Sequence, residues 1–306
     1  MGSKFSGLPL ALNPKQASQL YEGIEYRDFW IEKEKAKLDG LEHMLVRRLL
    51  PPAGKRIIDI GCGFGRLADC YLDRFEQVVM LDGSMTLLRQ AQEALKDRAV
   101  YVAADANRLP FATSSFDYTL MIRVFHHMPN SHWILSEIRR ILSADGILAF
   151  NYSNKLSAAQ LFHRLLRWNK ENPFVLEPVV SGKTLIHHHP AYVQRMLVKT
   201  GFSDMQYLGT GVMDKLTGKL GPFERWLPSD EAVAPLLGVI KLAPWIMCRT
   251  RAKGGFPLRD EKSIDDLFIC PACQSPLRRF GQAYVCSSCT LSYPVEDGIA
   301  DFRIGV

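Results

Sequence analysis

The sequence lacks any long uninterrupted apolar run. Its most apolar stretch, residues 232–248, contains two prolines and Lys241, and it is shorter than the roughly 20 apolar residues that cross a bilayer. The N-terminus has only a very short apolar patch followed by proline, unlike a secretory signal. We therefore expect a cytoplasmic protein without a transmembrane segment, in which residues 232–248 form buried core or a surface that faces a substrate.

The chain also carries little net charge, and few of its cysteines lie outside one C-terminal cluster. The 38 lysines and arginines exceed the 32 aspartates and glutamates by only 6 over 306 residues, which is a weak basis for predicting nucleic-acid or membrane-surface binding. Of the seven cysteines, Cys62, Cys70 and Cys248 are dispersed, and the other four cluster near the C-terminus. Without a secretory signal, this distribution favours a reducing compartment and a metal site over disulfides.

Strand-like and helix-like segments alternate over the first half of the chain. Residues 85–97 place Leu87, Leu88, Ala91 and Leu95 on one helical face. The five predicted strands are residues 56–60, 77–81, 99–103, 116–122 and 146–152. This alternation predicts an α/β fold with a doubly wound, mostly parallel sheet and helices on both of its faces.

The pattern loosens after residue 155. We expect helices within 156–168 and 188–202, the second ending at Gly201, and late strands at 203–208 and 243–250. Residues 251–263 are polar with paired glycines, as expected of a linker. The expected units are an N-terminal helical lid (1–40), a catalytic domain (41–255, with substrate-side insertions at 155–242) and a small cysteine-rich domain (256–306).

Three alternating glycines, Gly61, Gly63 and Gly65, follow the first predicted strand. Glycine permits a tight turn and lets a ligand touch bare backbone, which suits a nucleotide cofactor. The dinucleotide pattern G-x-G-x-x-G is not met, because the third glycine comes one residue early. Asp82, 21 residues after Gly61, ends the second strand and is placed to accept bonds from ribose hydroxyls. Asp105, at the end of the third strand, is suited to accept a bond from an adenine amine.

With these residues the sequence resembles the class I S-adenosylmethionine (SAM) dependent methyltransferases, and in particular the quinone-methyltransferase-like domains of type 11. The resemblance implies SAM as the cofactor and a Rossmann-like sheet of seven strands with the last strand antiparallel. The matching segments are IIDIGCGFG (57–65), LDGSMTLLRQA (81–91), AADANRLPF (103–111), FDYTLMIRVFHHMP (116–129) and LSADGILAF (142–150).

The resemblance also implies a role for individual residues. It places the methionine end of SAM near Asp59 and Gly61, the ribose on Asp82, the adenine ring against Met85 and the adenine amine on Asp105. Two alternatives stay open: Asp59 is also explained as a buried polar group at a strand end, and Met85 is also explained as ordinary packing of a helix. The complete predicted SAM set is Asp59, Gly61, Cys62, Gly63, Gly65, Asp82, Gly83, Ser84, Met85, Asp105, Ala106 and Arg123.

The methyl acceptor is expected just after the fourth strand, facing the irregular region 155–250. The segment from Arg123 to Pro129 reads RVFHHMP, which departs from the Asn/Asp-Pro-Pro-aromatic signature of methyltransferases that act on adenine or glutamine. His126 or His127 is a candidate catalytic base, because histidine titrates near neutral pH. In this family the same place often holds a histidine that only shapes the SAM pocket.

Three further segments invite a functional reading. Residues 187–190, HHHP, are expected to form a loop that lids the acceptor, since adjacent histidines point in different directions and few can share a metal ion. Residues 181–184, SGKT, are not a phosphate loop, because Glu177 stands where that loop needs glycine. An aromatic group near the N-terminus either closes over SAM or packs between helices: Tyr21, Tyr26, Phe29 and Trp30.

The C-terminal cysteines form two pairs, Cys270 with Cys273 and Cys286 with Cys289. Two such pairs supply four thiolates to a structural Zn²⁺ ion, which would carry the folding of a unit with little core. The segment resembles the small zinc-ribbon proteins that activate tRNA, ribosomal RNA and translation-factor methyltransferases, usually as separate subunits. Residues 256–306 hold 5 Lys/Arg and 7 Asp/Glu, which favours a stabilising or protein-contacting role over RNA binding.

Three functions are consistent with these patterns. The leading prediction is SAM-dependent methyl transfer to a small-molecule or lipid-like acceptor, favoured by the HHMP segment and the apolar residues 232–248. The alternative is a tRNA or rRNA methyltransferase, favoured by the ribbon and by the net charge of +8 on residues 1–255. The third is a non-enzymatic SAM-binding scaffold or activator that holds a protein partner through the ribbon.

Overall fold

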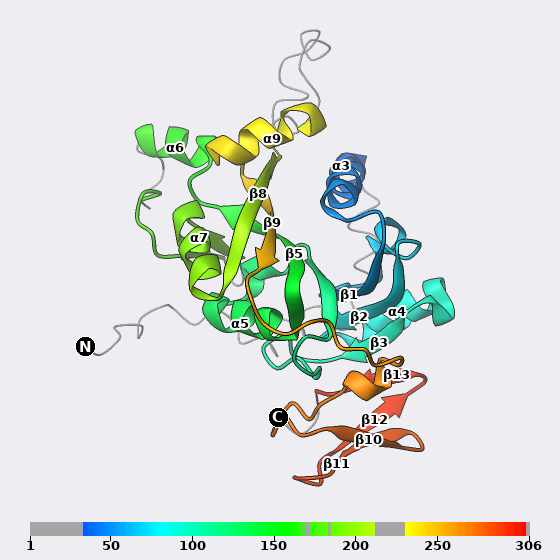
Figure 1. Ribbon diagram of the computed structural model, residues 1–306. Helices are drawn as coiled ribbons and strands as arrows, with labels where there is room; N and C mark the ends of the chain where they lie inside the picture. The colour runs from blue at the N-terminus through cyan, green and yellow to red at the C-terminus, as the bar shows by residue number, and fades with distance from the viewer. Residues whose placement is uncertain (1–32, 167, 169–171, 183–184, 212–229, 304–306) are drawn as a thin grey trace, which may run out of the picture.

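The computed structural model describes residues 33–166, 168, 172–182, 185–211 and 230–303 (Figure 1). Seven strands form the central sheet in the order β3-β2-β1-β4-β5-β9-β8. β9 is antiparallel to both of its neighbours, and the first five strands are parallel, which confirms the predicted doubly wound sheet. The strands are β1 (Gly54–Ile60), β2 (Phe75–Asp82), β3 (Val100–Ala103), β4 (Phe116–Met121), β5 (Leu142–Asn154), β8 (Phe202–Thr210) and β9 (Trp245–Ala252).

Helices cover both faces of this sheet. Ile57 packs with side chains of α3 and α4, whereas its neighbour Ile58 packs with those of α5 and α7, because successive strand residues point to opposite faces. No helix in the described part of the chain is long and apolar enough to cross a membrane. The helices are α3 (Lys33–Leu49), α4 (Met85–Leu95), α5 (Ser131–Ile141), α6 (Ala158–Leu165), α7 (Pro190–Lys199) and α9 (Asp230–Ile240), with 3₁₀ turns η1 (Ala68–Cys70), η2 (Lys96–Arg98), η3 (Phe125–His127) and η5 (Asp265–Leu267).

Two segments differ from the sequence prediction. His187 and His188 lie in strand β7 (Leu185–His188) rather than in a loop, because β7 pairs with β6 (Val179–Ser181) and with the last residues of β5. The apolar residues 232–248 divide into the exposed helix α9 and the buried start of β9. The predicted N-terminal aromatic group and residues 183–184 of the SGKT segment lie outside the described residues.

The cysteine-rich segment continues the central sheet. Its last strand runs parallel to β3, with Ile299 opposite Tyr101 and Asp301 opposite Ala103, and the Phe302 amide donates to the Ala103 carbonyl at 2.7 Å. This pairing covers an otherwise open sheet edge, and it places the ribbon at the lower end of the molecule in Figure 1. The ribbon strands are β10 (Leu277–Phe280), β11 (Ala283–Cys286), β12 (Ser292–Glu296) and β13 (Ile299–Asp301).

The segment expected to be a linker is instead held against the sheet. Arg56 on β1 is fully buried, and its guanidinium donates to the carbonyls of Arg259 at 2.8 Å, Glu261 at 2.6 Å and Ser115 at 2.9 Å. Buried carbonyls need donors, and one arginine satisfies several of them in a fixed geometry. The connection to the ribbon is therefore part of the folded structure rather than a flexible spacer.

Aromatic rings fill the junction between the ribbon and the central sheet. Phe302 is only 1% exposed, and its ring centroid lies 4.9 Å from that of Phe268 and 5.2 Å from that of Tyr293. Phe268 in turn lies 5.3 Å from Phe111, on the sheet side of the junction. This continuous cluster means that the ribbon shares the hydrophobic core of the main domain.

Replacing Phe302 with alanine should destabilise the whole protein. Loss of a fully buried phenylalanine leaves a cavity and costs about 3–5 kcal/mol of unfolding free energy, which denaturant unfolding monitored by circular dichroism would measure. Phe280→Ala is the matched control, because that ring is 64% exposed and its loss should cost less than about 0.5 kcal/mol. Equal stability of the two variants would show that the ribbon is not part of the core.

Candidate functional site

The glycine turn lies at the carboxyl end of β1. All three glycines have positive φ angles, 73° at Gly61, 57° at Gly63 and 81° at Gly65, a backbone region that other residues rarely adopt. At Gly61 a Cβ atom would also lie 2.2 Å from a methyl carbon of Val124. Both the backbone conformation and the close packing therefore require glycine at the start of the turn.

Asp82 fastens this turn to the next loop. One carboxylate oxygen accepts from the Gly63 amide at 2.8 Å, and the other accepts from the Ser84 amide at 2.9 Å. Ser84 caps α4 by accepting from the Leu87 amide at 3.3 Å. The predicted residues Cys62, Gly83 and Met85 are neighbours of these groups along the chain, and Met85 is the first residue of α4 and is buried in the core.

The third strand brings its predicted residues to the same edge. The Ala104 amide donates to the Asp82 carbonyl at 3.1 Å, so the segment with Asp105 and Ala106 lies beside the Asp82 loop. Asp105 accepts from the backbone and side-chain amides of Asn107 at 2.9 and 2.8 Å. The predicted set thus converges at the carboxyl ends of β1, β2 and β3, where open parallel sheets bind ligands.

Asp59 is a buried carboxyl group at the end of β1. It is 3% exposed and accepts a hydrogen bond from the Tyr71 hydroxyl at 2.8 Å. Burial raises the pKa of Asp59 to about 7, and the Tyr71 hydrogen bond only partly opposes this rise. At neutral pH this carboxyl group therefore lies near its titration midpoint.

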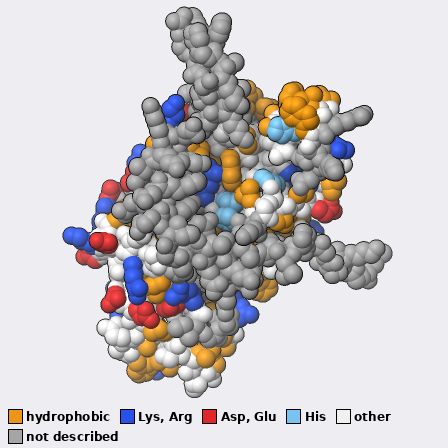
Figure 2. Space-filling view, turned by 180° about the vertical axis from the view of Figure 1, so that it is seen from behind, with side chains coloured by type: hydrophobic (Ala, Val, Ile, Leu, Met, Phe, Trp, Pro, Cys, Tyr) orange, Lys and Arg blue, Asp and Glu red, His pale blue; other side chains and the backbone are white. Residues whose placement is uncertain are grey.

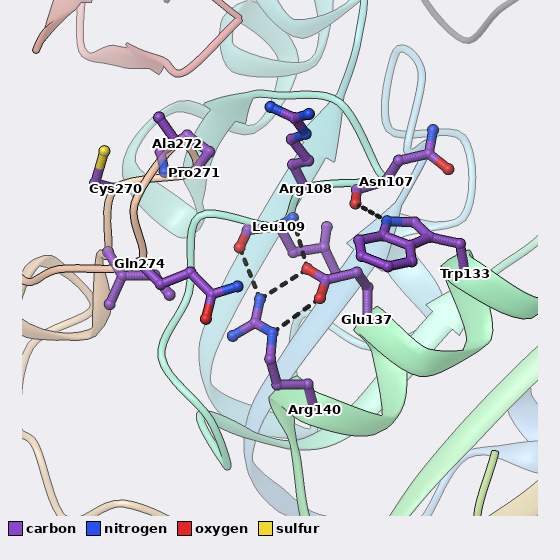
Figure 3. A pocket seen from close by; sticks show the side chains of 11 residues that line it. Asn107, Arg108, Leu109, Trp133, Glu137, Arg140, Cys270, Pro271, Ala272 and Gln274 are labelled. Carbon is purple, nitrogen blue, oxygen red and sulfur yellow. Dashed lines mark hydrogen bonds and ion pairs between the residues drawn. The ribbon is translucent and has the colours of Figure 1, made fainter. Parts of the chain in front are cut away.

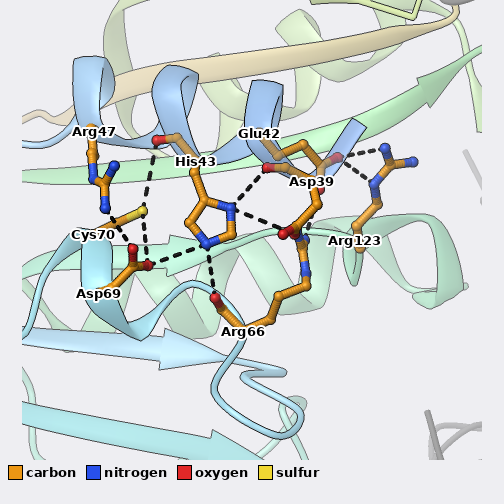
Figure 4. Close-up of polar contacts among 8 residues, drawn as sticks. All are labelled: Asp39, Glu42, His43, Arg47, Arg66, Asp69, Cys70 and Arg123. Atoms are coloured by element: carbon orange, nitrogen blue, oxygen red, sulfur yellow. Dashed lines mark hydrogen bonds and ion pairs between the residues drawn. The ribbon is translucent and has the colours of Figure 1, made fainter. Parts of the chain in front are cut away.

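A buried glutamate that the sequence did not single out links two arginines above the turn (Figure 4). Glu42 on α3 is fully buried and accepts from Arg66 at 2.7 Å and from Arg123 at 2.6 Å. Asp39, which lies on α3 like Glu42, forms a second ion pair with Arg66. In the sequence, only Arg66 directly after the glycine turn hints at this ion pair. Its partner Glu42 lies 24 residues away on a helix, so no local pattern reveals it.

Arg123 turns toward the acceptor side of the site. It has a φ angle of 64°, and its amide donates to the Asn151 side-chain oxygen at 2.7 Å. Its guanidinium lies 3.9 Å from the centroid of the Trp245 ring, a cation–π contact. The side chain predicted to bind the cofactor is thus held by Glu42 and Trp245.

Histidine side chains lie near the centre of the face shown in Figure 2. His126 is 5% exposed, and its ring lies 4.1 Å from that of His127 and 5.0 Å from that of Trp245. Burial, aided by the positive charges of neighbours, lowers the pKa of His126 well below its ordinary value. His187 adds a ring nitrogen 2.6 Å from the Ser153 hydroxyl.

Several buried polar atoms in this region make no hydrogen bond to any described residue, including the Tyr152 hydroxyl and both ring nitrogens of His188. Two others belong to the turn after β4 and to β5. They are Nδ1 of His126 and the side-chain nitrogen of Asn151. Buried polar atoms are nearly always paired, and an exception calls for a ligand, an ion or a water. His126 follows the carboxyl end of β4, and Asn151 lies in β5 three residues before that strand ends at Asn154, so both lie toward the edge of the sheet where the acceptor is predicted.

The four ribbon cysteines come together as predicted. The Cys270 and Cys289 sulfurs are 3.5 Å apart, those of Cys273 and Cys286 are 3.4 Å apart, and all four lie within 4.8 Å of one another. That grouping suits a tetrahedral metal ion. A second group of His43, Asp69 and Cys70 lies equally close, but its polar atoms are engaged with Arg47 and the Arg66 backbone (Figure 4).

The ribbon reaches the edge of the predicted SAM site. Arg303 donates to the Gly83 carbonyl at 3.1 Å. A pocket of about 210 Å³ separates the first cysteine knuckle from the segment after Asp105 (Figure 3). Within it, the Trp133 indole donates to the Asn107 carbonyl at 2.6 Å. The ribbon therefore contacts the loops on the adenine side of the predicted site.

Residues 58–150 match the protein family described as methyltransferase domain. Over these residues the chain therefore resembles known methyltransferase domains. Over 143 residues it is 32% identical to the 27-O-demethylrifamycin SV methyltransferase of Amycolatopsis mediterranei, which covers 43% of this chain and 52% of that protein. Over 102 residues it is 32% identical to a malonyl-[acyl-carrier protein] O-methyltransferase of Legionella pneumophila, covering 32% and 36%. The chain spans about half the length, or less, of the first curated relatives it matches.

Solved structures share the fold of the methyltransferase domain. The [4+2]-cyclase SpnF superposes with a TM-score of 0.57 at 18% identity, covering 82% of this chain and all of that one. A chain from the complex of the Haloferax volcanii Trm112 methyltransferase activator with a methyltransferase superposes with a TM-score of 0.51 at 18% identity, covering 74% and 96%. At these identities the likeness shows the Rossmann-like methyltransferase fold alone.

Asp59 should make the stability of the methyltransferase domain depend on pH in the absence of added ligand. Its folded pKa of about 7 exceeds the ordinary value of 3.8, so the folded state binds the proton more tightly than the unfolded state. The contribution of Asp59 to the unfolding free energy should be fully present below about pH 4 and should be lost, by up to about 4 kcal/mol, as the pH rises through 7.

Urea unfolding at a series of pH values measures this dependence. Asp59→Asn should flatten the curve between about pH 4 and 7, since no proton is then exchanged at this site. Asp73→Asn is the matched control, because that carboxylate is exposed on the surface, and it should keep the wild-type slope. A wild-type slope in Asp59→Asn would contradict the raised pKa.

Proposed function

We propose that the protein transfers the methyl group of SAM to a small-molecule or lipid-like acceptor. The proposal is carried by the glycine turn that Asp82 fastens, together with two unpaired buried atoms, His126 Nδ1 and the Asn151 side-chain nitrogen. The relatives include a 27-O-demethylrifamycin SV methyltransferase, a malonyl-[acyl-carrier protein] O-methyltransferase and a sterol 24-C-methyltransferase. These names indicate small-molecule and lipid-like acceptors.

The residues present fit SAM. The left-handed turn at Gly61–Gly65 leaves bare backbone for close approach of the cofactor. Asp82 already accepts two backbone bonds, and a carboxylate has about four acceptor positions, so it keeps capacity for ribose hydroxyls. Asp105 and Ala106 would hold the adenine, and Asp59 would lie near the methionine end. When bound, SAM supplies an electrophilic methyl group on a sulfonium sulfur.

His126 is the candidate base in this proposal. Burial lowers the pKa of His126 and keeps the imidazole neutral at pH 7, so Nδ1 can accept a hydrogen bond from an acceptor hydroxyl, although the same shift makes the ring a weaker base than an ordinary histidine. Arg123, held by Glu42 and Trp245, would orient the acceptor at the end of β4. His127 is the neighbouring alternative and lies less deeply in the protein.

We also propose that the four ribbon cysteines hold a structural Zn²⁺ ion. Four sulfurs within 4.8 Å of one another are the donor set that zinc prefers. The metal would stabilise the knuckles, and through β13 it would support the edge of the main sheet. The pairing of β13 with β3 favours a stabilising role within the chain over the capture of a separate protein partner.

Zinc removal should therefore weaken the whole protein. We expect stoichiometric zinc by mass spectrometry of the metal content, and a lower unfolding midpoint after treatment with a chelator. Cys273→Ser should lower the zinc content, because it removes one of the four ligands. Cys248→Ser is the matched control, a buried cysteine on β9 whose replacement should leave the zinc content unchanged. Full zinc retention in Cys273→Ser would reject the site.

Methyl transfer is tested with SAM that carries a labelled methyl group. We expect label in the lipid or small-molecule fraction of a cell extract incubated with the protein. We also expect Asp82→Ala to bind SAM about tenfold more weakly or worse, since two charged hydrogen bonds that shape the turn are lost. Asp73→Asn should bind SAM as the wild type does. Label confined to RNA would replace this proposal with the RNA methyltransferase, and no label with SAM bound would indicate the scaffold.

A further inference from the structure

The last strand of the ribbon ends level with the strands that carry the predicted SAM site. Ala103 on β3 lies opposite Asp82 on β2 and opposite Asp301 on β13, so the three residues form one row across three parallel strands. In such a sheet the residues that follow the carboxyl ends of neighbouring strands lie at one edge. The segment after β13 therefore reaches the edge that holds Asp82 and Asp105, although it belongs to the ribbon.

Arg303, two residues after β13, is held in one orientation by the buried carboxylate of Asp301. The two carboxylate oxygens accept from Arg303 Nε at 2.9 Å and from Nη2 at 2.8 Å, and the Arg303 backbone amide donates to the same carboxylate at 3.0 Å. A two-pronged pair of this kind fixes the plane of the guanidinium. The third nitrogen, Nη1, then donates to the Gly83 carbonyl at 3.1 Å.

The Gly83 carbonyl and the Ser84 amide belong to a single peptide unit, which is planar. Its carbonyl end accepts from Arg303, and its N–H end donates to one Asp82 carboxylate oxygen at 2.9 Å. Rotation of this unit would disturb both hydrogen bonds together. The other Asp82 oxygen accepts from the Gly63 amide at 2.8 Å. Arg303 is thus connected to the glycine turn through one peptide unit and one carboxylate.

A second contact from the ribbon holds helix α4, which begins just after this peptide unit. The Gln92 side chain donates to the Asp297 carbonyl at 2.8 Å, in the turn between β12 and β13. Arg89 and Glu296 form an exposed ion pair at 3.4 Å, which contributes little by itself. The ribbon therefore reaches past β3 and contacts both the loop after β2 and the helix that follows it.

We propose that Arg303 is a positioning residue for SAM. It holds the Gly83–Ser84 peptide unit, and through that unit it orients the Asp82 carboxylate that receives the ribose. Arg303 acts through the loop and needs no contact with the cofactor. The ribbon in this way sets the affinity for SAM, in addition to covering the sheet edge. This inference rests on the proposed function only for the identity of the cofactor.

Calorimetric titration of the full-length protein with SAM tests this role without any methyl transfer. We expect Arg303→Ala to bind SAM about five- to tenfold more weakly, because a charged hydrogen bond that fixes the loop is lost. Arg279→Ala is the matched control, since this ribbon arginine pairs with Asp265 at 3.0 Å within the ribbon, and it should bind SAM as the wild type does. Equal affinity of Arg303→Ala and the wild type overturns the proposal. A wild type that binds no SAM would reject the proposed function as well.

Hydrogen exchange of the ligand-free protein separates positioning from a general loss of stability. In Arg303→Ala we expect faster amide exchange in residues 83–87, measured by mass spectrometry, while strand β1 keeps its wild-type protection. Equal acceleration throughout the central sheet would show that Arg303 only stabilises the fold, and it would overturn the proposal.

A second variant keeps the test decisive if Arg303→Ala fails to fold. Asp301→Asn keeps the shape of the side chain but removes the charge that holds the guanidinium. It should loosen the same residues 83–87 and weaken SAM binding in the same direction as Arg303→Ala. Wild-type exchange and wild-type SAM affinity in Asp301→Asn would contradict the proposed role of the pair.

Discussion

The pairing of β13 with β3 is the interaction on which the arrangement of the molecule depends. A parallel sheet edge presents unpaired amides and carbonyls, and this chain covers that edge with its own last strand. The pairing brings Phe302 into the common core and Arg303 to the Gly83 carbonyl. Because β3 and β2 both end at the predicted SAM site, this pairing connects the cysteine-rich ribbon directly to the predicted cofactor loops.

The buried Arg56 gives this junction its register. Its guanidinium lies inside the main domain and donates to three carbonyls, two of them in the segment that leads to the ribbon. A buried arginine is costly without partners, so a register shift of the 253–263 segment would leave a charge unsatisfied. The segment composition, polar with paired glycines, predicted flexibility because composition does not reveal a partner 203 residues away.

The contrast between local patterns and contacts between distant residues explains what the sequence could and could not predict. The glycine turn, Asp82 and the parallel strands depend on local patterns, and the structure has the turn at Gly61–Gly65 and the carboxylate that fastens it. Glu42 was missed because an acidic residue on a helix is ordinarily solvent-exposed, and only the fold brings it between Arg66 and Arg123. The strand around His187 was missed because its short pairing with the end of β5 is a long-range contact.

Helix α6 raises a question of stability that the core does not answer. Helices as short as this one are marginal in water, and in folded proteins they form mainly because an apolar face packs on the core. α6 is capped by the Ser157 hydroxyl and anchored at its start by the Leu242 carbonyl, but none of its side chains is buried. Two hydrogen bonds offset only part of the entropy that the helix loses on ordering.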